Sequence, residues 1–325
     1  MSIIKNGKLT VNQLKKLIYS NLGKKREEVI TMPLVGQDCG YFYTEDNIIS
    51  ITTDPITATD TNIGKLSVII NLNDIATSFA EPFAITVTLL CPENTTEEKI
   101  YQIMKDISDE CIKNDVQIVG GHTEVTTAVN QILVCVTALG KLDKKRYEET
   151  EPIKSGDNIY MSKEISLEGS MIIACEKKEE LKDVLTDEEF EIAKLFLEKL
   201  SVVKESKLLK NKKISLMHDV TEGGILGALY EMCSYAQKGC MIDYDKIKIN
   251  SITKKISKFY NIDPLRLISS GCMLIITNEE ISEKIDDISF TKIGKITDDN
   301  KLLMKKDDGF IEIEEPDSDE IYKVI

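Results

Sequence analysis

Two periodicities organise the hydrophobic positions in the first half of the chain. Some segments repeat apolar residues at helical spacing, and others are continuous β-branched or aromatic runs of strand length. The segments with helical spacing are 8–22, 66–79 and 100–111. The strand-length runs are 41–43, 48–53, 83–90, 116–119 and 132–139. The first two runs are close enough to form a hairpin, and the order of all the segments predicts a sheet with one face covered by helices.

A charged stretch without apolar periodicity, Lys141–Lys154, precedes a second half of the same style. The strand-like runs of this half are 158–161, 214–217, 241–244, 272–277 and 291–297, and its helical segments are 168–177, 187–201 and 222–236. The acidic stretch 305–325 is predicted to be peripheral. The pattern therefore predicts an α/β (α+β) protein with two domains, residues 1–145 and residues 146–325.

Polar residues interrupt this pattern at helix starts and along one helix face. Thr95 and Glu98 fit a capping box before the helix over 100–111. Ser67, Asn71 and Asp74 follow one another by four and three residues, so they share a face of the helix over 66–79. This stripe either belongs to a site or is an ordinary solvated face.

Charge and cysteine content narrow the class of protein. The formal net charge is −14 over 325 residues, which argues against a nucleic-acid or anionic-membrane partner. No apolar run approaches about 18 residues, and the first residues lack a signal-peptide pattern. None of the eight cysteines forms a Cys-x-x-Cys pair, which is typical of buried, reduced thiols. We expect a cytoplasmic protein.

Acidic residues at a strand end and on the next helix are candidates for a metal site. Asp54 directly follows the run 48–53, and Asn71 and Asp74 come from the following helix. With Asp38 they offer the oxygen ligands that Mg²⁺ prefers. The alternatives are a turn or cap role for Asp54 before Pro55 and an ordinary helix surface for Asp74.

Two glycine-containing strings follow predicted strands. Gly120 and Gly121 would let the backbone approach a ligand, with His122 and Thr123 at the rim, or they would simply form a tight turn. The string 217–224 ends a strand in Asp219 and opens a helix at two glycines. The amides there could hold phosphate, with Thr221 as the N-cap, or the string is only a capped helix start.

Several common sites are missing from the sequence. It contains no Walker-type Gly-x-x-x-x-Gly-Lys-Ser/Thr, no Gly-x-Gly-x-x-Gly and no Gly-x-Ser-x-Gly. Its two histidines lack clustered cysteines, so a zinc site is not expected. Any nucleotide would be held by carboxylate-bound metal, by lysines such as Lys65 and by backbone amides.

Taken in order, these strings resemble the aminoimidazole-ribonucleotide (AIR) synthetase superfamily, with its PurM-like fold. Members include formylglycinamidine-ribonucleotide synthetase, thiamine-monophosphate kinase, selenophosphate synthetase and the hydrogenase-maturation factor HypE. HypE-like, AIR synthase-related proteins are the most similar, notably in the opening Gly7-Lys8-Leu9 and in Gly120–Glu124. The matching strings are Gly36-Gln37-Asp38, Thr52-Thr53-Asp54, Gly64-Lys65-Leu66, Asn71–Ala76, Gln117–Thr123, Lys154–Asp157, His218–Gly224 and Ser269-Ser270-Gly271.

The resemblance implies a fold and a set of functional residues. It implies two AIR synthase-like domains in a homodimer whose N-terminal sheets pair into a β-barrel, with ATP and Mg²⁺ in a cleft between the domains. The implied metal ligands are Asp38, Asp54 and Asp74. The implied cofactor-binding residues are Lys65, Asn71, Gly120, Gly121, His122 and Thr123. Asp54 and Asp219 are the implied catalytic residues.

The function implied is an ATP- and Mg²⁺-dependent enzyme of ligase or kinase type. It would activate a carbonyl or amide oxygen, or phosphorylate a small-molecule acceptor. The alternatives are a HypE-like hydrogenase-maturation factor acting with a partner protein, and a nucleotide-binding scaffold without turnover.

Three departures from the family pattern bear on these alternatives. HypE ends in a cysteine that carries a carbamoyl group, whereas this sequence ends Tyr322-Lys323-Val324-Ile325, so HypE's own reaction is not expected. Gln37 stands where an acid often precedes Asp38, and His122 stands where kinase-like members have an Asp. Both lower the negative charge available to a second metal.

Overall fold

A computed structural model describes residues 8–57, 59–316 and 318–325, so Gly7 lies outside the described residues. Contacts between Cα atoms divide the chain into two compact units. The N-unit consists of Glu28–Thr31 and Asp38–Glu149. The C-unit consists of the residues up to Glu27, Met32–Gln37 and Thr150–Ile325. The first helical segment therefore belongs with the second half of the chain, although the sequence pattern grouped it with the first.

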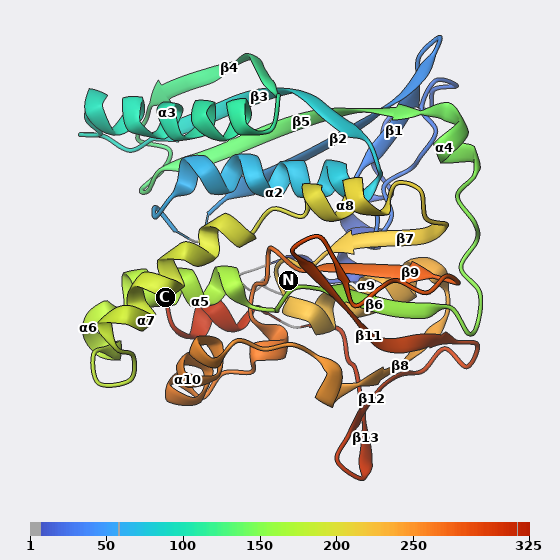
Figure 1. The fold of residues 1–325 in the computed structure, drawn as a ribbon. Coiled ribbons are helices and arrows are strands. Elements are labelled where there is room, and N and C mark those ends of the chain that lie inside the picture. Colours follow the sequence, from blue (N-terminus) through green and yellow to red (C-terminus); the bar gives the residue numbers. More distant parts are fainter. Residues whose placement is uncertain (1–7, 58, 317) are drawn as a thin grey trace. The chain divides into compact units, whose positions relative to one another are not determined.

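The N-unit contains one mixed sheet with the strand order β1-β2-β5-β3-β4 (Figure 1). Its strands are β1 (Gly40–Tyr43), β2 (Asn47–Ile56), β3 (Glu81–Cys91), β4 (Gln117–Val125) and β5 (Leu133–Asp143). Its helices are α2 (Ile63–Thr77), α3 (Glu97–Lys113) and α4 (Lys144–Glu148). β1 and β2 form the predicted hairpin, and only β3 and β4 among the described strand pairs of this sheet are parallel.

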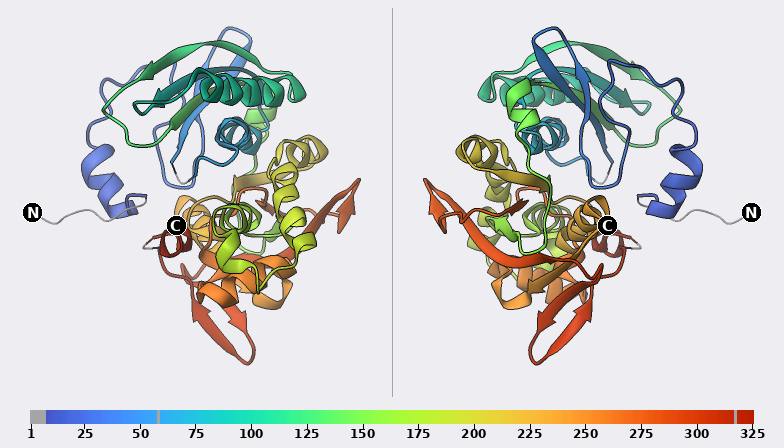
Figure 2. Two further views of the ribbon diagram at one scale, coloured as in Figure 1. Left: turned by 90° about the vertical axis from the view of Figure 1, so that its left-hand side faces the viewer. Right: turned by 90° about the vertical axis from the view of Figure 1, so that its right-hand side faces the viewer.

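Helices α2 and α3 pack on the same face of this sheet, as the sequence pattern predicts (Figure 2). Burial alternates along β2 and β5 because successive side chains point to opposite faces. On the opposite face the apolar side chains of β2, β3 and β5 are only half-buried. They are Ile49, Ile51, Leu90, Leu133 and Leu139.

Helix α2 is buried nearly all round, including Ser67, Asn71 and Asp74. The solvated-face alternative for this polar stripe is therefore wrong. Buried polar side chains are costly unless they are hydrogen-bonded, so their partners define what the stripe does.

Two predicted helix starts differ from the structure in detail. The first helical segment is shorter than the predicted 8–22. It consists of α1 (Val11–Gln13) and the π-helical stretch Leu14–Ile18 that follows it directly. The N-cap of α3 is Thr96, whose side chain accepts a hydrogen bond from the backbone N–H of Lys99. Thr95 instead donates its hydroxyl to the carbonyl of Pro92.

The C-unit is built on a larger sheet with the order β13-β12-β8-β11-β6-β9-β7, and β10 pairs with β11. Its strands are β6 (Asn158–Ser162), β7 (Ile214–Asp219), β8 (Gly239–Asp243), β9 (Met273–Thr277), β10 (Lys284–Ile285), β11 (Ile288–Thr297), β12 (Leu302–Lys306) and β13 (Gly309–Glu312). Its longer helices are α5 (Leu167–Glu176), α7 (Asp187–Lys194), α8 (Val203–Leu209), α9 (Gly224–Ala236) and α10 (Ser251–Tyr260), with a short α6 (Lys178–Leu181). Ile225, Leu229 and Met232 of α9 join the apolar core that includes Ile159 and Leu274 of the sheet.

The acidic stretch 305–325 is peripheral only in part, because Gly309–Glu312 is exposed whereas the segment from Ile313 onwards is anchored. Ile313, Asp319 and Ile321 are each at most 3% exposed. The 3₁₀ helix Glu320–Lys323 follows Asp319, which caps it through the N–H of Ile321. Isolated apolar residues within an acidic stretch therefore anchor this segment to the C-unit.

Two further properties concern the described residues as a whole. None of their helices is long and apolar enough to cross a membrane. All eight cysteines lie among these residues as thiols outside any disulfide, and six of them are buried, the exceptions being Cys135 and Cys175.

Candidate functional site

The end of β2 is joined to α2 by a pair of hydrogen bonds between Asp54 and Asn71. The backbone N–H of Asp54 donates to Oδ1 of Asn71 at 2.9 Å, and Nδ2 of Asn71 donates to the carbonyl of Asp54 at 3.2 Å. Nδ2 also donates to the carbonyl of Ser67 within the helix. The Asn71 amide is fully buried and uses both of its polar atoms. This contact fixes the position of Asp54 relative to the helix.

Asp74 lies one turn further along α2, under the same strand. The hydroxyl of Thr52 donates to its Oδ2 at 2.5 Å, and the Asp74 side chain is almost completely buried. The thiol of Cys39 contacts the carbonyl oxygen of Asp74 at 3.2 Å. Because Cys39 follows Asp38 in the chain, this contact ties the Asp38 segment to the same turn of α2.

Asp38, Asp54 and Asp74 thus all belong to the N-unit, but they do not form a ready-made cage. Within the described residues, their three carboxylates do not all lie within 4.8 Å of one another. Mg²⁺ usually binds one or two carboxylates and completes its shell with water and substrate phosphate. The donor set fits such an ion by its chemistry, and the assignment of the three aspartates as ligands stays a prediction.

Lys65 lies in the first turn of α2 and is partly exposed. It precedes Asn71 by six residues, which is about 9 Å along a helix axis. Its role in phosphate binding stays a prediction.

The predicted loop at Gly120-Gly121 is instead part of β4, which continues to Val125. Val119 is the extra residue where the β3–β4 register shifts, because Ile118 pairs with Ile85 and Gly120 with Thr86. A Cβ on Gly121 would overlap the carbonyl oxygen of Val87, whereas a Cβ on Gly120 would meet nothing within 4 Å. The tight-turn alternative is therefore wrong, and Gly121 is required by the close approach of two strands.

The register of the sheet separates the β4 residues from Asp54. Asp54, Val136, Val87 and Gly121 pair in one row across four strands, so Gly121 lies three strand spacings, about 14 Å, from Asp54. His122 is in the next row and points to the face opposite α2. There its Nε2 lies 2.8 Å from Oε2 of Glu124, and both side chains are largely exposed. Within the N-unit, His122 is not part of the Asp54–Asn71 cluster.

Asp219 is the last residue of β7, in the C-unit, and is 1% exposed. The neighbouring His218 is 4% exposed. Nδ1 of His218 lies 4.0 Å from Oδ1 of Asp219, and Nε2 lies 2.9 Å from Oε2 of Glu231 on α9. Burial raises the pKa of Glu231, but the hydrogen bond from His218 and the charges of Lys8 and His218 outweigh it and hold the pKa at about 2.

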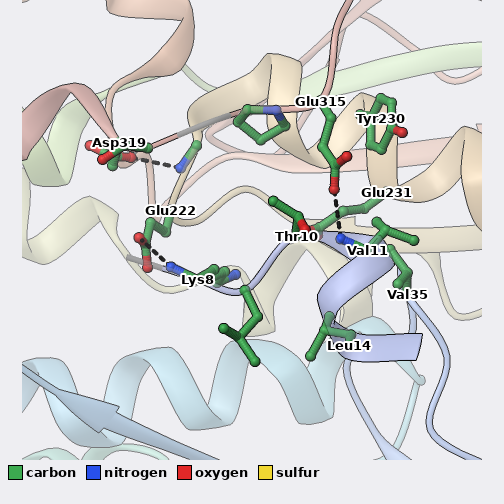
Figure 3. Close-up of a pocket in the computed structure, with 14 residues that line it drawn as sticks. Lys8, Thr10, Val11, Leu14, Val35, Glu222, Tyr230, Glu231, Glu315 and Asp319 are labelled. Atoms are coloured by element: carbon green, nitrogen blue, oxygen red, sulfur yellow. Dashed lines mark hydrogen bonds between the residues drawn. The ribbon is translucent and has the colours of Figure 1, made fainter. Parts of the chain in front are cut away.

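The start of α9 differs from the prediction in two ways. The N-cap is Gly223 at φ 85°, not Thr221. The amide of Gly223 donates to Oδ2 of Asp319 at 2.6 Å (Figure 3). Oδ1 of Asp319 accepts from the backbone N–H groups of Ile268 and Ile321. Burial raises the pKa of Asp319 to about 6. An aspartate of the same chain therefore occupies the position predicted for phosphate.

A pocket of about 50 Å³ lies beside this helix start, entirely within the C-unit (Figure 3). Leu9, Val11, Leu14 and Val35 form its apolar wall, and Glu222, Glu231 and Glu315 its acidic side. The backbone of Lys8 donates to Glu222, and that of Val11 donates to Glu315. The described part of the Gly7-Lys8-Leu9 string therefore packs against the string 217–224.

The sequence patterns missed three carboxylates that the fold places near these strings. Glu231 is the only acid within α9, so its isolation in an apolar helix was an available signal. Glu168 at the start of α5 and Asp319 in the tail come from segments without chemical motifs. Burial raises the pKa of Glu168 to about 7, although the Ser270 amide donates to it.

Two relatives are similar in sequence to this chain over most of its length. It is 28% identical over 233 residues to a putative hydrogenase expression/formation protein of Methanocaldococcus jannaschii, covering 72% of this chain and 67% of the relative. It is 25% identical over 291 residues to a thiamine-monophosphate kinase of Pyrococcus horikoshii, covering 84% and 86%.

Solved structures share the fold. The chain in the HypE–HypF complex superposes with a TM-score of 0.72 at 21% identity, covering 94% of this chain and 99% of that one. The hydrogenase maturation protein HypE in complex with ATP gives a TM-score of 0.70 at 17% identity, covering 94% and 92%.

Two family descriptions account for most of the chain. Residues 36–142 match the AIR synthase related protein, N-terminal domain, and residues 154–305 match the AIR synthase related protein, C-terminal domain. The two matches follow one another in the order that the sequence motifs predict. The chain therefore belongs to the family of AIR synthase related proteins.

Proposed function

We propose that this protein is an ATP- and Mg²⁺-dependent enzyme of kinase or ligase type. It phosphorylates a small-molecule acceptor or activates its carbonyl or amide oxygen. The observation that carries the proposal is the buried polar stripe of α2, where Asn71 fixes Asp54 and Thr52 fixes Asp74. Phosphoryl transfer depends on positioning and on charge neutralisation, and this arrangement orients the carboxylate of Asp74 and fixes the backbone that carries Asp54.

Asp38, Asp54 and Asp74 are the residues that would hold magnesium. Bound magnesium neutralises phosphate charge and orients the transferred group. Lys65 contacts phosphate, and Asp219 takes part in the same reaction. Gly120, Gly121, His122 and Thr123 belong to the nucleotide-binding surface of β4. The relative that is a thiamine-monophosphate kinase and the HypE structure with ATP support this class of function.

The protein acts as a homodimer whose partner covers the exposed face of the N-unit sheet. This face presents half-buried apolar residues on neighbouring strands, including the directly paired Ile51 and Leu139. β4 is an edge strand with exposed Val119 and Val125. Apolar faces and open edges of this kind are typical of interfaces.

The direct test measures ADP release by the full chain with ATP and Mg²⁺, together with the ATP-dependent thermal shift. Asp54→Asn and Asp219→Asn are expected to abolish turnover. The matched controls are Asp46→Asn and Asp245→Asn, which remove exposed aspartates of the N-unit and the C-unit. Wild-type protein that neither binds nor hydrolyses ATP contradicts the proposal.

A second function is favoured by two of the comparisons. The relative from Methanocaldococcus jannaschii carries a hydrogenase expression/formation name, and one structural neighbour is a complex of HypE with HypF. On this alternative the chain is a maturation factor, and its acceptor is a group on a partner protein. ATP binding without turnover until a partner protein is added supports it, whereas binding that never leads to turnover points to a scaffold.

A further inference from the structure

Glu231 is the single acidic residue of α9, and its side chain points back toward the 217–224 string. Glu231 lies two turns into α9, and its Oε2 is 2.9 Å from Nε2 of His218 on β7. The His218 side chain is 5% exposed and that of Glu231 is 25% exposed. The pair is therefore largely shielded from water, where a charge-assisted hydrogen bond holds its geometry well.

The chemistry of this contact assigns the imidazole proton. A carboxylate with a pKa of about 2 is ionised at neutral pH and can only accept hydrogen bonds. Nε2 of His218 must therefore carry the proton. This leaves Nδ1 as the ring atom that faces Oδ1 of Asp219, at 4.0 Å.

A glycine of another motif packs closely against the turn of α9 that carries Glu231. Gly36 has φ 77°, and a Cβ built on it would lie 2.5 Å from the carbonyl oxygen of Glu231 and 3.1 Å from Cβ of Tyr235. Only a glycine lets the chain pack so closely against this turn of α9. The Gly36-Gln37-Asp38 string thus has a role in the C-unit that is separate from the carboxylate of Asp38.

We propose that Glu231 is a positioning residue that acts through His218 on Asp219. It fixes the ring orientation of His218 and keeps a proton on Nε2, and it thereby holds Nδ1 facing the almost completely buried carboxylate of Asp219 at 4.0 Å. Histidines beside functional carboxylates or metals are commonly oriented by such a second acid. The inference rests on the proposed function, because it assigns Glu231 to the reaction in which Asp219 takes part.

Steady-state kinetics of the full chain test this role. Glu231→Met removes the acceptor at similar side-chain length, and it is expected to lower kcat about 10- to 100-fold without changing KM for ATP. Glu231→Gln keeps an oxygen acceptor at the same distance and is expected to restore much of the lost kcat. Glu191→Gln, which removes an exposed acid of α7, is the control and is expected to match the wild type.

A spectroscopic measurement separates positioning from a merely structural effect. The chain has only two histidines, so a His122→Gln background leaves His218 as the single source of imidazole ¹⁵N signals. We expect a pattern with the proton on Nε2 when Glu231 is present and a mixture of tautomers in Glu231→Met. If Glu231→Met does not fold, Glu231→Asp, whose carboxylate is withdrawn by one methylene, provides the comparison.

The outcomes distinguish this role from the proposed function itself. Wild-type protein without ATP turnover overturns both. Wild-type turnover that persists unchanged in a folded Glu231→Met variant overturns the role of Glu231 alone. A His218 signal with its proton on Nδ1 in the presence of Glu231 also overturns it.

Discussion

Asp54 and Asn71 are joined through the backbone of the aspartate, by one hydrogen bond in each direction. The contact uses no side-chain atom of Asp54. The backbone that carries this carboxylate is therefore held by a neutral amide. Such an arrangement suits a residue that has to present its charge to a ligand.

Asn71→Ala is expected to destabilise the protein and to lower ADP release. It leaves the N–H and the carbonyl of Asp54 without this partner, and a buried polar group that loses its partner costs about 1–3 kcal/mol. We expect a loss of at least about 2 kcal/mol in the free energy of unfolding, measured by urea denaturation. Asn114→Ala is the control, because Asn114 also donates to a helix carbonyl four residues back but caps the end of α3. An Asn71→Ala variant as stable as Asn114→Ala would contradict the role of this contact.

Gly121→Ala and Gly120→Ala form a matched pair on β4. The first substitution forces a Cβ onto the carbonyl oxygen of Val87, and the second places it in open space. We expect Gly121→Ala to cost about 1–3 kcal/mol of stability, because the strands must separate or the backbone must shift. Gly120→Ala should change stability by less than about 0.5 kcal/mol. Thermal melts of the two variants measure this difference in stability. Equal melting temperatures would show that the close contact between β3 and β4 at Gly121 does not require a glycine.

Glu168 is expected to make stability fall as pH rises. Burial raises its pKa from 4.5 to about 7, so the folded chain holds the proton more tightly than the unfolded chain. The free energy of unfolding should therefore decrease between about pH 4.5 and pH 7 and level off above that, by up to about 3 kcal/mol. Denaturation of Glu168→Gln should lack the part of this decrease that falls between about pH 6 and pH 7.

A smaller decrease below pH 6 should remain in Glu168→Gln, because Asp319 keeps its raised pKa of about 6. Glu191→Gln should retain the full decrease of the wild type. Identical pH profiles for Glu168→Gln and wild type would refute the assignment to Glu168.

The proposed dimer predicts a change in mass for variants of the exposed sheet face. Leu139→Glu places a charge beside Ile51, at the centre of the proposed interface, and should yield monomers in sedimentation equilibrium. Ile112→Glu is the control, because Ile112 is 74% exposed on α3, the helix on the other side of the sheet. A wild type that is monomeric, or a Leu139→Glu variant that remains dimeric, would count against the interface.

The strands and helices of both units could be predicted largely from local pattern. The hairpin, α2, α3, and the strands and helices around Asp219 follow from apolar periods of two and 3.6, which record which side of an element is covered. The prediction was incomplete even where burial is one-sided, as in α10, which buries Ile252 and Ile256 and exposes Lys254 and Lys255. It missed α10 and the β12–β13 hairpin, and it placed the N-cap of α3 one residue early. It also treated the tail as peripheral, because four buried side chains, two of them acidic, leave no periodic signal in an acidic stretch.

The candidate site also contains a part that could be predicted from the sequence and a part that could not. The residue types and their order along the chain made Asp54, Asn71, Asp74 and Asp219 candidates, because a carboxylate after an apolar strand is visible in sequence. Partners distant in sequence were not visible. Three such contacts depend on which elements pack together: Thr52 with Asp74, Glu231 with His218, and Asp319 with the start of α9. The packing of the elements follows from the cooperative burial of apolar surface.

By itself, the sequence determined the family, the order of most elements and a set of candidate residues for ATP and magnesium, because these depend on local chemistry and spacing. The tertiary structure decided that the polar stripe of α2 is buried and that Gly120-Gly121 lies within a strand. It also decided that Asp319 fills the helix start predicted for phosphate. These features arise from strand register and from close packing between segments far apart in the chain, which no local pattern encodes.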